Sequence, residues 1–273
     1  MDNRSFDDKR IAQGYACDRP WLHKVVIERM KSDLNIGKNF HNGLDVGCGA
    51  GLSTRALKLI CDSVTGTDIS REMIQACIEN HDASEYTFYA AKAEETHLPG
   101  VPYDIVTAAG VINWVDKDTF LENMKLVMAS KALLVIYDFW ISDHMPGNDA
   151  YTEWFHNFYL TEFPRPPRNE EVWHQSNLPE GFIIKDQVTY KMRHEFDLDT
   201  FIRFMMTQSN VHLQIQRGQK TENEIYRKMK ITLSQIFCET DQTLIFDAYS
   251  WYIERWCVKL LKAKLLIAIK LIY

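Results

Sequence analysis

Segments with strand character alternate with amphipathic stretches along the first half of the chain. The strand-like segments lie at residues 43–46, 62–68, 86–90, 103–108 and 132–137. Between them, apolar residues recur three and four positions apart, as Phe120, Met124 and Val127 do, which is typical of the buried face of a helix. Strands and helices in this order predict a parallel α/β sheet with right-handed crossovers.

The pattern changes after Trp140. Residues 141–180 are rich in aromatic residues, proline and histidine, and they predict a helical and loop insertion over the carboxyl edge of the sheet, where ligands bind. Two more strands and two helices are predicted later, at residues 182–190 and 244–256 and at residues 198–206 and 222–237. We therefore predict a doubly wound, mostly parallel seven-stranded sheet with an N-terminal helical lid and a helical cap after the fifth strand.

These segments predict one domain that spans residues 1–258, with residues 1–40 as the lid and residues 141–180 as the cap. Residues 259–273 form a basic apolar tail with four lysines among leucine, isoleucine and alanine. A basic amphipathic tail can contact a membrane surface. We favour the other interpretations of the tail, namely a packed terminal helix, a subunit contact or residues foreign to the ancestral fold.

One turn between a strand and a helix carries the strongest chemical signal. Residues 43–51 end with three alternating glycines, with Asp45 two positions before the first of them, and Asp68 ends the next strand. This arrangement predicts a nucleotide site. A dinucleotide fingerprint would need glycine at Leu52, and Asp45 would repel a pyrophosphate but attract an ammonium group. Both facts favour S-adenosylmethionine; a tight turn without a ligand is the alternative.

Four blocks in order resemble the class I, Rossmann-like methyltransferases, especially the small-molecule, type 11 group that includes trans-aconitate methyltransferase. The first block is Tyr-x-x-x-Arg-Pro-aromatic at residues 15–21, and the second is the acid and glycine turn at residues 45–51. The third is Ala-Glu-x-x-x-Leu-Pro at residues 93–99, and the fourth, at residues 104–114, joins Asp-Ile-Val to Asn-Trp. The resemblance implies a methyltransferase enzyme with S-adenosylmethionine as its cofactor.

The resemblance also implies roles for individual residues. Asp45 would hold the cofactor ammonium group directly or through water, Asp68 would bind both ribose hydroxyls, and the backbone N–H of Ala93 would face the adenine. Tyr15 and Arg19 would cover the cofactor and hold its carboxylate, unless they form only a surface cap. The predicted cofactor-binding residues are Tyr15, Arg19, Asp45, Gly47, Cys48, Gly49, Asp68, Ile69, Ala93, Glu94 and Ala109.

The acceptor side departs most from the family. Lys92 stands where relatives often carry an acid, and Asn113 replaces a frequent histidine and cannot act as a general base. The sequence therefore assigns no catalytic residue. We expect an acceptor site among Asn113, Trp114, His156 and Arg165, with the alternatives that the histidine is structural and the arginine is solvated. A carboxylic acid acceptor would need no base and would pair with an arginine.

Composition excludes few function classes. The net charge is −6, with 46% hydrophobic and 25% charged residues, so nucleic acid is not expected as a partner. The six cysteines have spacings that suit neither a metal site nor a disulfide framework. A polar N-terminus and the lack of an 18-residue apolar run predict a cytoplasmic protein, as a monomer or homodimer.

The sequence therefore predicts methyl transfer to a small-molecule acceptor, such as a carboxylic acid, by in-line displacement. The alternatives are a protein or nucleic-acid methyltransferase and a non-catalytic scaffold protein that binds S-adenosylmethionine. Residues 109–112 lack the Asn/Asp-Pro-Pro-aromatic motif of many enzymes that methylate protein side-chain amides.

Overall fold

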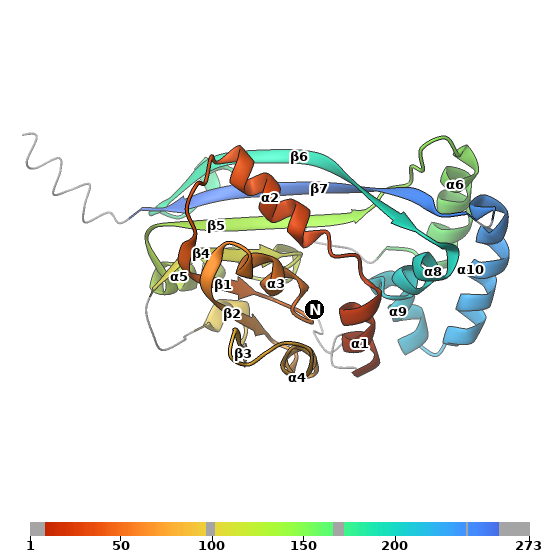
Figure 1. The fold of residues 1–273 in the computed structure, drawn as a ribbon, viewed down its shortest axis with the longest axis horizontal. Helices are drawn as coiled ribbons and strands as arrows, with labels where there is room; N and C mark the ends of the chain where they lie inside the picture. Colours follow the sequence, from red (N-terminus) through yellow and green to blue (C-terminus); the bar gives the residue numbers. More distant parts are fainter. Residues whose placement is uncertain (1–8, 97–101, 166–171, 239, 257–273) are drawn as a thin grey trace, which may run out of the picture.

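Seven strands form one mixed sheet in the order β3-β2-β1-β4-β5-β7-β6 (Figure 1). The computed structural model describes residues 9–96, 102–165, 172–238 and 240–256. The strands are β1 (Phe40–Val46), β2 (Cys61–Asp68), β3 (Tyr86–Ala90), β4 (Tyr103–Ala109), β5 (Met128–Ile141), β6 (Phe182–Phe196) and β7 (Gln242–Arg255). Strands β1 to β5 pair in parallel, whereas β7 is antiparallel to both β5 and β6.

Helices cover both faces of the parallel part. They are α2 (His23–Asp33), α3 (Leu52–Lys58), α4 (Arg71–Asn80) and α5 (Lys117–Val127). Helix α1 (Lys9–Asp18) packs against α4 instead. Central strand β4 is buried from Ile105 to Ala108, as expected for a parallel strand covered on two faces. Side-chain caps fix the starts of two helices, because Ser70 accepts from the N–H of Met73 and Asp116 accepts from that of Thr119.

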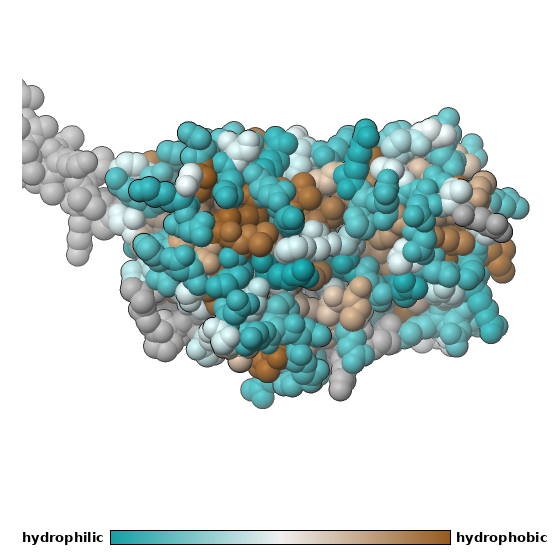
Figure 2. Space-filling view, viewed as in Figure 1, coloured by the Kyte–Doolittle hydropathy of each residue, from teal (hydrophilic) through white to brown (hydrophobic). Residues whose placement is uncertain are grey.

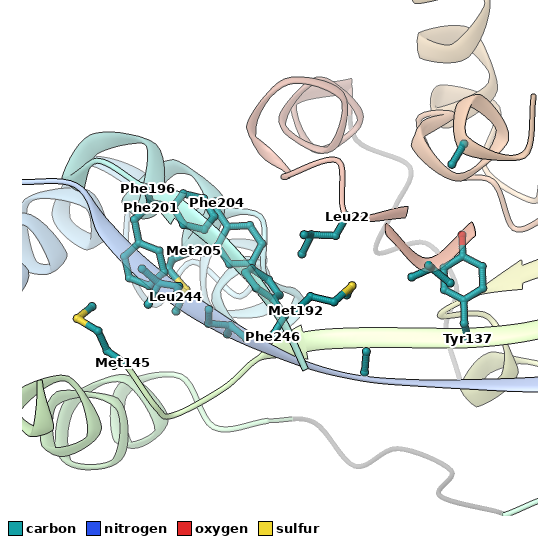
Figure 3. Packing of buried hydrophobic residues seen from close by; sticks show 14 of the residues in the cluster. Leu22, Tyr137, Met145, Met192, Phe196, Phe201, Phe204, Met205, Leu244 and Phe246 are labelled. Carbon is teal, nitrogen blue, oxygen red and sulfur yellow. The ribbon is translucent and has the colours of Figure 1, made fainter. Parts of the chain in front are cut away.

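The last three strands run past the parallel sheet into a second group of helices, which we name the helical lobe (Figure 1). It contains α6 (Asp149–Trp154), the π-helical turn η4 (Phe155–Tyr159), α7 (Leu160–Glu162), α8 (Leu198–Met206), α9 (Ser209–Gln216) and α10 (Glu222–Phe237). Figure 3 shows its aromatic packing, in which Phe196, Phe204 and Phe246 lie together with ring centroids 5.5–6.3 Å apart. One continuous core therefore joins the lobe to the sheet.

The predicted seven-stranded fold with an N-terminal helical lid is confirmed, with longer strands than expected. β5 continues four residues beyond Tyr137, because Asp138 to Ile141 pair with β7 after β4 has ended. The helices predicted at residues 198–206 and 222–237 are α8 and α10. Helix α9 is additional.

Figure 2 shows a mostly hydrophilic face on which apolar residues form separate patches. No helix in the described part of the chain has the length and apolar content to cross a membrane. The tail at residues 259–273 lies outside the described residues.

Candidate cofactor and acceptor site

A cavity of about 410 Å³ opens at the carboxyl ends of the parallel strands. Its floor comes from the end of β5 and from the residues that follow β1, β2, β3 and β4, and its cover comes from α1, the start of α2 and the start of α9. Ligands of open α/β sheets bind at this edge. The fold therefore gathers residues that are far apart in the sequence around one space.

The glycine turn after β1 forms one wall of the cavity. Gly47 and Gly49 have φ angles of +66° and +53°, which side chains other than glycine rarely adopt. A Cβ on Gly47 would lie 2.2 Å from Val111, whereas a Cβ on Gly49 would have no atom within 4 Å and would enter the cavity. The turn is thus an open cradle in which backbone can contact a ligand.

Asp68 ends β2 beside this cradle. Its Oδ2 accepts from the N–H of Gly49 and its Oδ1 from the N–H of Ser70, each at 2.9 Å. These bonds hold the half-buried carboxylate in the cavity wall. Because each carboxylate oxygen has two acceptor positions, the group can also accept the two hydroxyls of a ribose.

Asp45 lies beneath the turn and does not line the cavity. Its fully buried carboxylate accepts from the hydroxyls of Ser53, Thr54 and Thr107 at 2.6–2.7 Å. Burial raises its pKa to about 6, although the three hydroxyl bonds oppose that rise. The structure therefore places Asp45 as the anchor of the glycine turn and does not bring it to the position of a direct ammonium ligand. Cys48, also predicted at the site, is buried behind the cavity.

The residues that follow β2 and β3 line the cavity beside Asp68. Ile69, Ala93 and Glu94 all border the cavity, as predicted. The carbonyl of Ala93 accepts from Asn123, and Oε1 of Glu94 accepts from the N–H of Asp116, so both residues are tied to the α5 side. Lys92, where the sequence departs from the family, also borders the cavity, and its ammonium pairs with Glu95 at 2.9 Å.

Tyr15 and Arg19 line the cavity from the lid, as predicted. The guanidinium of Arg19 lies 3.6 Å from the centroid of the Tyr15 ring. It also donates to the side-chain oxygen and the carbonyl oxygen of Thr207, each at 3.2 Å. Because Thr207 follows α8, this contact joins the lid to the helical lobe across the cavity.

The other half of the cavity, which we name the aromatic half, contains the rings of His23, Trp114, Tyr137, Phe139 and Trp140. It begins at Ala109, a predicted site residue, and continues along the extension of β5. Its walls are formed by His23, Gly110, Val111, Trp114, Val115, Tyr137, Asp138, Phe139, Trp140, Gln208 and Ser209. This half therefore combines flat apolar surfaces with a few polar groups, as small-molecule sites do.

His23 is the titratable group that sequence reasoning missed here. It opens α2, and its Nδ1 lies 2.8 Å from the hydroxyl of Tyr137. The imidazole packs edge-on against Tyr137 and Phe139. Burial, together with the nearby positive charge of Arg19, lowers the pKa of His23 to about 3. The imidazole is therefore neutral at physiological pH.

The structure brings only one of the four predicted acceptor residues to the cavity, Trp114. Asn113 is its neighbour in the turn but does not line the space. His156 lies on the helical lobe and pairs with Asp143 at 2.8 Å, and this pair lowers the pKa of the Asp143 carboxyl. Arg165 lies over the ring of Phe155, 5.8 Å from its centroid.

The cap at residues 141–180 does not cover the site as expected. None of its described residues lines the cavity. Residues 149–163 pack within the helical lobe, where Trp154 donates to Thr232 of α10 at 2.8 Å. Trp173 instead packs against Phe120 of α5 and Trp251 of β7. Besides the lid, the cover includes the start of α9, which sequence reasoning did not predict. One signal in the sequence could have indicated His23 as a site residue, because it lies two residues after the Arg-Pro-Trp segment of the lid.

Comparison with known proteins identifies the domain that carries this cavity. Residues 44–136 match the family model described as a methyltransferase domain. The protein is an S-adenosylmethionine-dependent methyltransferase. Its class I fold is shared with a structure named as a type II methyltransferase from Anaeromyxobacter dehalogenans, at a TM-score of 0.64 and 19% identity, over 85% of this chain and 95% of that one.

Two curated proteins are also similar to this methyltransferase. A Dictyostelium discoideum protein named as a methyltransferase is 23% identical over 241 residues, which cover 86% of this chain and 89% of the relative. An O-methyltransferase of Penicillium expansum is 30% identical over 130 residues, which cover 44% of this chain and 47% of the relative. The sheet edge of the methyltransferase fits its cofactor, because the open cradle at Gly49 and the fixed carboxylate of Asp68 adjoin one cavity.

Proposed function

We propose that this methyltransferase methylates a small-molecule acceptor, which binds in the aromatic half of the cavity beside the cofactor. The observation that carries this proposal is the continuity of the cavity from Gly49 and Asp68 to Trp114 and Phe139. An acceptor in the aromatic half would lie next to the cofactor, under the cover of the lid and α9. The lid contact between Arg19 and Thr207 closes over this space and favours an acceptor of limited size.

We propose that the cofactor is held in the other half of the cavity, which we name the glycine half and which contains Gly47, Gly49, Asp68, Ile69 and Ala93. Asp68 would accept the ribose hydroxyls, Gly47 and Gly49 would contact the methionine part, and Ile69 and Ala93 would border the adenine. Tyr15 and Arg19 would cover the cofactor. The position of Asp45 behind the turn favours an indirect role, through water or through the shape of the turn.

S-adenosylmethionine supplies, when bound, a methyl group on a positively charged sulfur. The contribution of the protein is then to align the acceptor with that group and to exclude water, which together lower a barrier by several kcal/mol. The half-buried rings of Trp114 and Phe139 are suited to orienting a flat acceptor.

A carboxylic acid acceptor receives less support from the geometry than from the sequence. Arg165, the arginine that the sequence suggested, lies on the helical lobe and does not line the cavity. Arg203 of α8 pairs with Asp18 at 3.2 Å and does not line it either. Arg19 is at the cavity but is held by Thr207 and Tyr15. We therefore propose a small-molecule acceptor without a requirement for a carboxylate.

Calorimetric titration of the protein with S-adenosylmethionine, with NAD as a control, tests the proposed cofactor site. We expect micromolar affinity for S-adenosylmethionine and no signal with NAD. Asp68→Ala should weaken binding about 10- to 100-fold, because hydrogen bonds to a charged group contribute about 1.5–3 kcal/mol. Asp62→Ala, at the other end of β2, removes only an exposed pair with His41 and should bind normally. Equal affinity of both variants would contradict the role of Asp68.

Formation of S-adenosylhomocysteine with a panel of small phenols, amines and carboxylic acids then tests the acceptor. Turnover with a member of the panel, and none with peptides or RNA, is the expected result. Cofactor binding without turnover on any class would favour the scaffold alternative, and turnover only on a macromolecule would overturn the small-molecule proposal.

A further inference from the structure

His23 lies in the aromatic half of the cavity and has no part in the proposed binding of the cofactor. His23 uses Nδ1 for its contact with the hydroxyl of Tyr137, and within the described residues its Nε2 forms no hydrogen bond. The ring is fixed from two sides, with centroids 5.7 Å from Tyr137 and 5.0 Å from Phe139. A ring nitrogen is thus presented on a rigid support in the wall of the cavity.

This histidine lies at the acceptor end. Tyr137 and Phe139 belong to the end of β5, which adjoins Ala109 at the end of β4, whereas Asp68 and Ala93 lie across the sheet on β2 and after β3. The imidazole therefore lies in the aromatic half of the cavity, away from the glycine half in which the nucleoside of the cofactor would bind. Trp114 and Trp140 border the same space.

The surroundings of His23 keep its ring uncharged. The groups that face this end are Arg19 from the lid, Tyr15 from α1, and Tyr137 and Asp138 from β5. Burial and the charge of Arg19 lower the pKa of the imidazole, and burial raises that of the Tyr137 hydroxyl well above its usual value. His23 and Tyr137 thus pair as uncharged groups, and either Nδ1 or the tyrosine hydroxyl can donate in their 2.8 Å contact. The tautomer in which Nδ1 donates to the tyrosine oxygen leaves Nε2 as an acceptor.

Building on the function proposed above, we propose that the acceptor is an uncharged compound with a hydroxyl on an aromatic ring, and that Nε2 of His23 receives the proton of that hydroxyl. Tyr137 is a positioning residue that holds the imidazole in this tautomer. The rings of Phe139 and Trp114 supply flat surfaces for the acceptor.

The chemistry of the step suits a weak base. The acceptor oxygen forms a bond to the methyl carbon while the carbon–sulfur bond breaks and leaves its electron pair on sulfur, and the hydroxyl proton passes to Nε2. As the oxygen gains its third substituent, its proton becomes far more acidic than that of an imidazolium, so even a histidine of low pKa can accept it. The same low pKa then returns the proton to water.

Binding of three naphthalene probes in the presence of S-adenosylhomocysteine tests the acceptor class. The probes are 2-naphthol, its methyl ether 2-methoxynaphthalene, and 2-naphthoic acid, titrated by calorimetry at neutral pH. We expect 2-naphthol to bind about fivefold or more tightly than the other two, because each lacks a donor for the neutral imidazole. His23→Asn should abolish this preference. The matched control is His156→Asn, which loses only the exposed pair with Asp143 and should keep the preference.

Kinetics and magnetic resonance test the role of the imidazole. His23→Asn should lower kcat with 2-naphthol about 100-fold or more, whereas Tyr137→Phe should lower it less. The imidazole resonance that disappears in His23→Asn should show no protonation above pH 5 in the wild type. It should shift on addition of 2-naphthol, and Tyr137→Phe should alter its tautomer.

The outcomes separate this proposal from the proposed function. Normal binding of S-adenosylmethionine by His23→Asn, with loss of the naphthol preference and of turnover, supports both. Tighter binding of 2-naphthoic acid, unchanged kcat in His23→Asn, or no binding of any probe by a protein that binds the cofactor overturns the role of His23 alone. Failure of the wild-type protein to bind S-adenosylmethionine overturns the proposed function first.

Discussion

Gly49 and Gly218 share a backbone conformation but differ in surroundings, which makes them a matched pair. Their φ angles are +53° and +65°, and a Cβ on either would have no atom within 4 Å. Alanine should therefore cost each site about 1–2 kcal/mol of unfolding free energy through strain. Only Gly49→Ala should also weaken S-adenosylmethionine binding, by about tenfold or more, since only its Cβ enters the cavity. Calorimetry and urea unfolding measure both quantities; equal cofactor affinities would contradict the cradle.

Asp45 gives the protein a pH dependence whose sign follows from its environment. Burial raises its pKa from an ordinary value of 3.8 to about 6, so the folded state binds a proton that the unfolded state has already released. Stability from this group is therefore present at low pH and is lost as the pH rises through about 6. Above that pH, the buried and ionised carboxylate lowers the unfolding free energy by about 3 kcal/mol, because each unit of pKa corresponds to about 1.4 kcal/mol.

Asp45→Asn removes this titration and keeps a side chain of the same shape. From pH 7.5 to pH 5, the wild type should gain about 1–2 kcal/mol of unfolding free energy relative to the variant. Urea unfolding of both proteins at several pH values measures the difference. The same dependence of unfolding free energy on pH in both proteins would show that Asp45 keeps an ordinary pKa. The hydrogen bonds from Ser53, Thr54 and Thr107 would then offset the effect of burial.

At the scale of elements, the parallel strands could be predicted because their signal is local. Each lies between a turn and a helix with regular spacing, and β2 and β4 lie within a residue of the predicted ranges. The extension of β5 could not be predicted from its own residues. Asp138 interrupts the apolar run, and the strand continues to Ile141 because β7 supplies pairing partners from far along the chain.

Helix α9 shows the same limit for the site. Its buried residues include Asn210, His212 and Gln214, so it lacks the apolar stripe by which an amphipathic helix is predicted. Asn210 is buried because it donates to the carbonyl of Phe163 and accepts from Tyr159. Tertiary partners of this kind leave no periodic signal. The glycine half of the site was therefore visible in the sequence, whereas the cover at α9 and the imidazole at His23 were not.

The lid should depend on one arginine. Arg19→Ala removes two hydrogen bonds to Thr207 and the stacking on Tyr15, which together join α1 to the helical lobe. We expect S-adenosylmethionine affinity to fall about tenfold and cleavage within α1 by protease to accelerate, since the hydrogen bonds contribute about 1 kcal/mol each. The control Arg29→Ala loses a surface pair with Asp33 and should change neither measurement. Identical behaviour of the two variants would exclude a closing role for Arg19.

At the scale of the whole molecule, the sheet and the helical lobe share strands, and the cavity lies where they meet. β5, β6 and β7 run through both parts, and one cluster of buried residues extends from Val26 on α2 to Phe237 on α10 (Figures 1 and 3). Separate unfolding of the lobe would expose the apolar face of these strands. We therefore expect the two parts to unfold together, so that loss of packing in the lobe also reduces the stability of the cofactor site.

Phe246 tests this coupling because it packs between the parts. It lies on β7 with 1% of its surface exposed, and its ring is 5.5 Å from Phe204 of α8 and 6.3 Å from Phe139 at the cavity. Phe246→Ala should lower the unfolding free energy by about 3–5 kcal/mol and should leave a single urea transition by both circular dichroism and tryptophan fluorescence. Leu126→Ala, at a position that is 67% exposed, should cost about 0.5 kcal/mol or less. Two separated transitions in Phe246→Ala would show that the lobe folds as an independent unit.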